Sequence, residues 1–100
     1  MTRIRHLRIA SELFKIITEA FTFEEFLQEA LPSIIILEVK MIDGLKEAKI
    51  LFTISDGNAK NYIKDLNGLT PYFRTIIAKN LNLKRIPTLS FVYQKDQPLH

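Results

Sequence analysis

The sequence contains no cysteine and no tryptophan, and only three glycines and four prolines among its 100 residues. Without cysteine the chain has no disulfide framework and no thiolate nucleophile, and only His6 and His100 could supply imidazole ligands to zinc. We therefore expect no metal site and no cofactor. The absence of cysteine also suits the reducing cytoplasm, where we expect the protein to reside.

Long hydrophobic runs are missing as well. The longest uninterrupted apolar run, Ile34 to Leu37, falls far short of the roughly 20 residues that a bilayer requires. Near the N-terminus, Glu12 and Glu19 interrupt the apolar residues that a targeting segment would need. We expect no membrane contact, and the length fits one domain comprising residues 1–100.

Enzyme motifs are absent too. The three glycines are widely separated and each lies at a predicted turn, so the chain has no phosphate-binding loop and no dinucleotide fingerprint. The sequences G-x-S-x-G and H-E-x-x-H do not occur. Glu24, Glu25 and Glu29 could pair for acid–base chemistry, but glutamates on the polar side of a short helix are typical of a solvated face. We therefore expect no catalysis and no small-molecule substrate.

Positive charge is present in modest excess, with a formal net charge of +3, and it is segregated along the chain. Residues 1–8 contain three arginines and no acid. Residues 9–56 contain four basic and nine acidic residues, a net charge of −5, whereas residues 57–95 contain seven basic residues and one acid, a net charge of +6. A basic end on a small domain is typical of a protein that binds a polyanion, although a solvated lysine-rich surface has the same composition.

Apolar residues at spacings of three and four predict a first helix over residues 3–21, with its buried stripe formed by Ile4, Leu7, Ala10, Phe14, Ile17 and Phe21. Thr22 and Glu25 form a capping-box pattern, which predicts a short second helix that ends before Pro32. Two further helices are predicted over residues 59–67 and 70–82, with Asn58 and Thr70 as their N-caps and Gly68 as the stop between them.

Alternating patterns predict three strands. Residues 34–42, with Ile35, Leu37, Val39 and Met41 facing the core, pair as an antiparallel hairpin with residues 48–54, and a last strand follows Pro87. The helical crossover between the second and third strands favours a parallel pair. The predicted fold class is α+β, in the order α-β-β-α-α-β, with a three-stranded mixed sheet and helices packed on one face.

This order, with two helices joined by a tight turn, is that of the type II K-homology domain, which grips RNA with a Gly-x-x-Gly loop. Here the loop reads Asn67-Gly68-Leu69-Thr70-Pro71, so that motif is missing. The chain resembles the ribosome-binding factor A family, a K-homology variant in which a kink replaces the loop. The resemblance rests on Tyr72-Phe73-Arg74, on Leu81-x-Leu83-Lys84-Arg85, on Pro87-x-Leu89-x-Phe91, on the hairpin residues Leu45 and Ala48-Lys49-Ile50, and on the N-terminal Arg5, Arg8 and Ile9.

Several positions depart from the family pattern. Leu69-Thr70-Pro71 replaces the usual Ala-x-Gly kink, Gly44 replaces an aspartate before the hairpin leucine, and Gln94 replaces an acid after the last strand. The flexible C-terminal tail of the family is either absent here or cut off from this sequence. We expect these departures to change contacts at the kink while the architecture is kept.

The resemblance implies a non-enzymatic, cytoplasmic ribosome assembly factor, a monomer linked to growth in the cold. Its implied partners are the free small (30S) ribosomal subunit and the 16S rRNA, which it would bind during late maturation and processing. Among the basic residues, arginine suits bidentate phosphate contact and lysine acts as a point charge. The residues predicted to contact RNA are Arg74, Lys79, Lys84 and Arg85, supported by Lys60, Lys64, Arg3, Arg5 and Arg8.

Two other interpretations of these residues remain open. Tyr72 and Tyr93 could stack on bases, although aromatic residues at such spacings more often pack in the core. Alternatively, the same fold could be a protein-interaction module whose acidic N-terminal half, including Glu24, Glu25 and Glu29, docks a basic partner.

Overall fold

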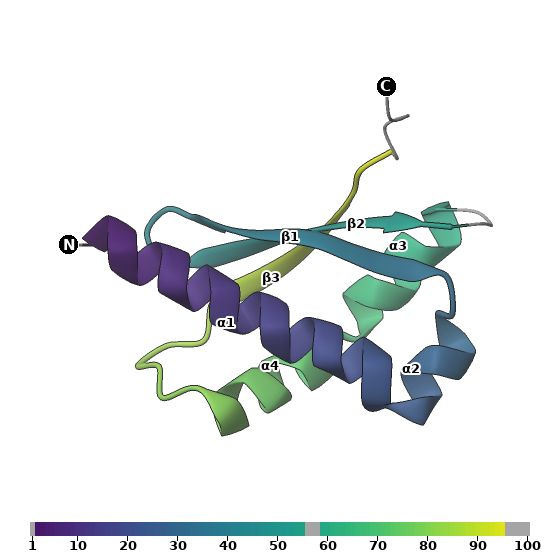
Figure 1. Cartoon of the computed structure of the whole chain (residues 1–100), viewed down its shortest axis with the longest axis horizontal. Helices are drawn as coiled ribbons and strands as arrows, with labels where there is room; N and C mark the ends of the chain where they lie inside the picture. The colour runs from purple at the N-terminus through teal and green to yellow at the C-terminus, as the bar shows by residue number, and fades with distance from the viewer. Residues whose placement is uncertain (1, 56–58, 96–100) are drawn as a thin grey trace.

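A three-stranded sheet lies on a layer of helices that covers one of its faces (Figure 1). The computed structural model describes residues 2–55 and 59–95, apart from the side chains of residues 2, 3 and 59. Its elements, in chain order, are α1 (Thr2–Phe23), α2 (Glu25–Ala30), β1 (Ile34–Ile42), β2 (Glu47–Ile54), α3 (Ala59–Gly68), α4 (Thr70–Asn80) and β3 (Thr88–Tyr93).

The sheet has the order β1-β2-β3, with β1 antiparallel and β3 parallel to the central strand β2. The crossover from β2 to β3 passes through α3 and α4, which is why those two strands run in the same direction. The predicted α+β class, with its mixed sheet and one-sided helices, is confirmed. Within the described residues, no helix combines the length and hydrophobicity needed to span a membrane.

The core lies between the sheet and the helices. Side chains with no exposed surface come from every layer, among them Ile17 of α1, Ile50 and Phe52 of β2, and Phe73 of α4. The Phe73 ring lies between those of Phe21 and Phe91, with centroid distances of 5.6 Å and 5.5 Å. Phe73 thus joins α1, α4 and β3 in one aromatic cluster.

The predicted alternation of β1 is wrong in its first half. A β-bulge between Ile36 and Glu38 adds one residue to β1, so the alternation shifts at Leu37. Ile34 and Ile36 therefore pack against the core, whereas Ile35 and Leu37, predicted to be buried, are exposed. Beyond the bulge, Val39 is buried as predicted.

The predicted buried stripe of α1 is also partly wrong. The helix carries two apolar stripes about one residue apart, and the sheet covers the one that contains Leu13, Ile17 and Ala20. Ile4, Leu7 and Phe14 belong to the other stripe and are exposed. Periodicity identifies an amphipathic helix, but it does not decide between two overlapping stripes.

Three predicted helix ends differ from the structure. The Thr22 hydroxyl donates to the carbonyl of Thr18 within α1, and Glu24 is the N-cap of α2 without a side-chain cap bond, so no capping box forms. The Thr70 hydroxyl likewise donates to the Asn67 carbonyl, and Leu69 is the N-cap of α4, which ends at Asn80. The predicted N-cap Asn58 lies outside the described residues.

Candidate nucleic-acid interface

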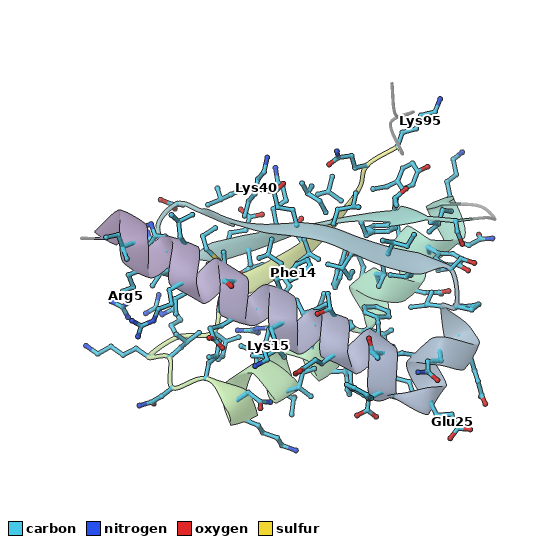
Figure 2. All side chains as sticks on the ribbon, in the orientation of Figure 1. Arg5, Phe14, Lys15, Glu25, Lys40 and Lys95 are labelled. Carbon is cyan, nitrogen blue, oxygen red and sulfur yellow. The ribbon has the colours of Figure 1, made fainter. Side chains whose placement is uncertain are left out.

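Three segments that are distant in sequence meet at one end of the molecule. They are the N-terminal turns of α1, the turn between β1 and β2, and the segment between α4 and β3 (Figure 1). Two adjoining hollows of about 310 Å³ and 430 Å³ open between them and share Arg5, Ile9 and Leu83 as lining residues. Figure 2 shows Arg5 at this end of α1.

The turn between β1 and β2 is shaped by Asp43 and Gly44, which adopt positive φ values of 53° and 70°. Asp-Gly pairs favour this backbone because glycine has no Cβ and aspartate tolerates the left-handed region. Lys46 lies on the same turn, with its ammonium nitrogen 3.8 Å from a carboxylate oxygen of Asp43. Both side chains are exposed, so this ion pair leaves the lysine accessible to a ligand.

The segment between α4 and β3 is fastened to its neighbours by two hydrogen bonds. The Thr88 N–H donates to the Lys46 carbonyl at 2.9 Å, which ties the start of β3 to the hairpin turn. The Arg74 guanidinium donates to the Ile86 carbonyl at 3.2 Å, which ties the segment to α4. Pro87 is fully buried between these two anchors, so the exposed Lys84 and Arg85 extend from a held backbone.

Positive charge dominates this end. Its exposed cations come from all three segments, and we call this set the basic end: Arg5, Arg8, Lys46, Lys84 and Arg85. Asp43 is the sole acid among the described residues that line the two hollows. The other lining residues are largely apolar, including Ile4, Ile9, Leu45, Leu83 and Pro87. Cations around an apolar surface suit a polyanion whose phosphates meet the charges while sugars or bases meet the hydrocarbon.

The structure divides the nine residues predicted to contact RNA. It brings four of them together at the basic end: Arg5, Arg8, Lys84 and Arg85. Lys60 and Lys64 belong to α3, which lies away from that end in Figure 1, and Lys79 lies in the last turn of α4. Arg74 holds the Ile86 carbonyl, so it has a positioning contact within the fold. Arg3 belongs to α1, but its side chain lies outside the described part of the chain.

Sequence reasoning missed Lys46 as a member of the basic end. It lies in the acidic middle of the chain, where the net charge is −5, so charge along the sequence gave no signal. The available signal was the Asp43-Gly44 turn, since a tight hairpin returns the chain at that point and presents the residues of its turn together.

The position of the K-homology glycine loop is closed by backbone bonds. Only Leu69, with φ −97° and ψ 1°, separates α3 from α4. Its N–H donates to the Leu66 carbonyl and its own carbonyl accepts from the Phe73 N–H, at 3.0 Å and 3.1 Å. Gly68 is the last residue of α3, as the sequence predicts for the helix stop, and it ends the helix without a positive φ. At the kink, Leu69 packs against the core where K-homology domains have a glycine loop that binds phosphate.

Both candidate stacking residues pack against the core. The Tyr93 ring is half-buried 5.8 Å from that of Phe52, and the Tyr72 ring is half-buried 5.2 Å from that of Phe73. Both tyrosines therefore pack against the core, as the sequence favours, while each remains partly exposed. Within the described residues, no group of three or more acidic or histidine side chains could hold a metal ion.

Comparisons with known proteins agree with the fold. A sequence model described as ribosome-binding factor A matches residues 5–97. The ribosome-binding factor A of Francisella philomiragia is 37% identical over 90 residues, a match that covers 89% of this chain. The chain spans 62% of the length of that relative. The ribosome-binding factor A of Mycoplasmoides gallisepticum is 27% identical over 94 residues, covering 93% of this chain and 78% of the relative.

Two solved structures share the architecture. A solution NMR structure of a Thermotoga maritima protein, described as a candidate ribosome binding factor A, has a TM-score of 0.77 at 23% identity and covers 96% of this chain and 92% of its own. The crystal structure of ribosome-binding factor A from Thermus thermophilus has a TM-score of 0.76 at 13% identity, and the match covers 93% of this chain and 99% of that structure's chain. At these identities the structures establish the fold alone. The match over residues 5–97 and the Francisella relative show that the chain belongs to the ribosome-binding factor A family.

Proposed function

We propose that this chain is a ribosome assembly factor that binds the free small (30S) ribosomal subunit through its 16S rRNA during late maturation. It acts as a binding protein in the cytoplasm, as a monomer and without catalysis, and residues 1–100 form its single domain. The family resemblance extends the proposal to rRNA processing and to growth in the cold.

The basic end is the observation that carries this proposal. Five exposed cations from three segments line two adjoining hollows, and hydrogen bonds at Ile86 and Thr88 hold the backbone that directly follows Lys84 and Arg85. A solvated surface would not require lysines and arginines from distant segments to converge. Because K-homology domains that grip RNA use a glycine loop, and Leu69 closes that position here, the basic end takes over the phosphate contacts.

Cosedimentation of the purified protein with small subunits, over a series of KCl concentrations, tests the proposal. We expect the triple variant Arg5→Glu, Lys84→Glu, Arg85→Glu to lose most of its binding. If each lost phosphate contact lowers the log–log salt slope by about 0.7, the slope should fall by about 2. Lys46 and Arg8 remain in this variant, so residual binding at low salt is expected.

The matched control is the triple variant Lys15→Glu, Lys40→Glu, Lys95→Glu, whose members are all exposed, lie away from Arg5 in Figure 2 and are not among the predicted RNA contacts. It loses the same six units of charge, so it should retain nearly the binding of the unchanged protein. Equal loss in both variants would show that net charge alone drives association and would overturn the assignment of the basic end. Equal binding to large and small subunits would contradict the proposed partner.

A further inference from the structure

A second groove lies on the helical layer, between the C-terminal half of α1 and α4, with a volume of about 210 Å³. Its apolar lining includes Ile16, Phe23 and Ile76, and its carboxylates are those of Glu19 and Glu24. The residues that line it include no lysine, arginine or histidine. We call this feature the acidic groove.

Two aromatic rings remain uncovered around the acidic groove. The side chain of Phe23, at the end of α1, is 75% exposed, and that of Phe26, on α2, is 44% exposed. The Phe26 ring meets Tyr72 edge to face, with centroids 5.1 Å apart and planes at 86°. Tyr72 lines the groove, so this contact links the exposed ring of α2 to the groove itself. Exposed phenylalanines next to a groove are typical of a surface that a partner covers.

The position of Phe26 is held by the junction of α1 and α2. The Gln28 side-chain amide donates to the Thr22 carbonyl, and the Glu24 N–H donates to the Ala20 carbonyl at 2.9 Å. These bonds fix the direction in which α2 leaves α1. The aromatic and acidic side chains are therefore presented on an ordered backbone.

The electrostatics of the acidic groove favour a cation. Burial, together with the negative charge of Glu24, raises the pKa of the Tyr72 phenol above its ordinary value. Glu25, the first residue of the adjoining helix α2, is a further acidic residue beside Glu24 in the chain, and Figure 2 shows it at the end of the molecule opposite Arg5. A Lys or Arg side chain could place its hydrocarbon stem along the apolar lining, its charge near the carboxylates and its cation against an aromatic face.

We propose that the acidic groove binds a lysine- or arginine-rich segment of a protein partner. The charge of the groove disfavours RNA, so its ligand differs in class from that of the basic end. This inference does not depend on the proposed function, because the groove is described by residues that the basic end does not use. It places a protein-binding site and an RNA-binding site on one small domain.

Fluorescence anisotropy with a labelled hexa-arginine peptide and the full chain tests this proposal in the absence of RNA. The unchanged protein should bind this peptide and not a hexaglutamate peptide. The double variant Glu19→Gln, Glu24→Gln should bind about tenfold more weakly if each carboxylate contributes up to about 0.7 kcal/mol, within the range for exposed ion pairs. Replacement of Phe23 with alanine should weaken binding roughly threefold through loss of a cation–π contact.

The matched control is Glu12→Gln, Glu38→Gln, which removes the same charge from exposed positions outside the groove. Its affinity should stay within about twofold of the unchanged protein, as expected for a distant charge that is screened by salt. Equal weakening in the control would show that binding follows net charge and would overturn the site. Analytical ultracentrifugation tests whether a second copy of this chain occupies the groove instead. If the protein self-associates, and Glu24→Gln and Arg85→Glu each abolish that self-association, the groove binds a second copy. That result would refute the proposal of a different protein partner.

Discussion

The basic end and the acidic groove have opposite charges, and these charges have different local explanations. Glu24 and Glu25 are the N-cap and the first-turn acid of α2, so they stabilise the positive N-terminus of that short helix. The first turn of α1 contains no acidic residue, and Arg5 lies there against the helix dipole. The acidic residues thus stabilise the helix to which they belong, whereas the charge of Arg5 is unfavourable for α1.

This difference shows which charges are the stronger evidence for a ligand. An unfavourable charge at a helix end points to a role outside the helix, and the basic end has further cations from two other segments. For the acidic groove the charges alone would be insufficient, because α2 accounts for part of them. The exposed rings of Phe23 and Phe26 provide the independent argument there.

The largest expected effect is on the core that both ends share. Replacement of Phe73 with alanine should lower the free energy of unfolding by about 3–5 kcal/mol, since the ring is fully buried between Phe21 and Phe91. Urea unfolding measures this loss. Because α4 forms one side of the acidic groove and leads into Lys84 and Arg85, RNA and peptide binding should weaken together. Loss of one kind of binding with full retention of the other would show that only one of the two surfaces depends on this core.

A smaller effect is expected at Arg5, where one substitution should change protein stability and ligand binding in opposite directions. The substitution Arg5→Glu should raise the free energy of unfolding by about 0.3–1 kcal/mol, because a negative charge then lies at the positive end of the helix. The same change should weaken binding to the small subunit. Thermal unfolding at low ionic strength, paired with cosedimentation, checks both directions. A destabilised Arg5→Glu protein would mean that Arg5 makes a structural contribution that outweighs the dipole.

The smallest expected effect reports on the acidic groove through Tyr72. Its folded-state pKa is raised above 10.0, so the neutral phenol is favoured in the folded state. That stability is fully present below pH 10 and is lost as the pH rises through the folded-state pKa, because the unfolded chain releases its proton first. In urea titrations above pH 10, Tyr72→Phe should lose less stability than the unchanged protein, and Glu24→Gln should lie between them. Identical slopes in all three proteins would contradict a negative potential in the groove.

Much of the fold is predictable because its signals are local. The bounds of β1 agree with Pro32-Ser33 before it and Asp43-Gly44 after it, and the start of β3 follows Pro87. The bulge at Leu37 was not predictable, since an inserted residue leaves the composition of the strand unchanged and only the partner register reveals it. The same holds for Phe14, whose exposure depends on which of two stripes the sheet covers.

The candidate site shows the same division. Lys84 and Arg85 stand out in the sequence as a basic pair, and the structure places them at the basic end. Lys46 enters that end only because the hairpin turn and the start of β3 are joined by a hydrogen bond between Thr88 and Lys46. The acidic groove has a similar origin, since Glu19 and Tyr72 are distant in sequence and meet where α1 packs on α4. The distribution of charge along the sequence therefore indicates that one surface is basic and another acidic, but it does not identify which residues form each surface.

The length of α1 has a consequence for how the two proposed sites act together. Arg5 and Glu19 are 14 residues apart, which at 1.5 Å per residue is about 21 Å along α1, so this one helix fixes the separation between the basic end and the acidic groove. A particle that presents an RNA surface and a basic protein tail at this spacing gains avidity, because occupation of the first site raises the effective concentration at the second. An assembly intermediate that lacks either feature loses that gain. If both proposed sites bind one particle, α1 therefore sets the distance between the RNA and the basic protein segment that the particle must present.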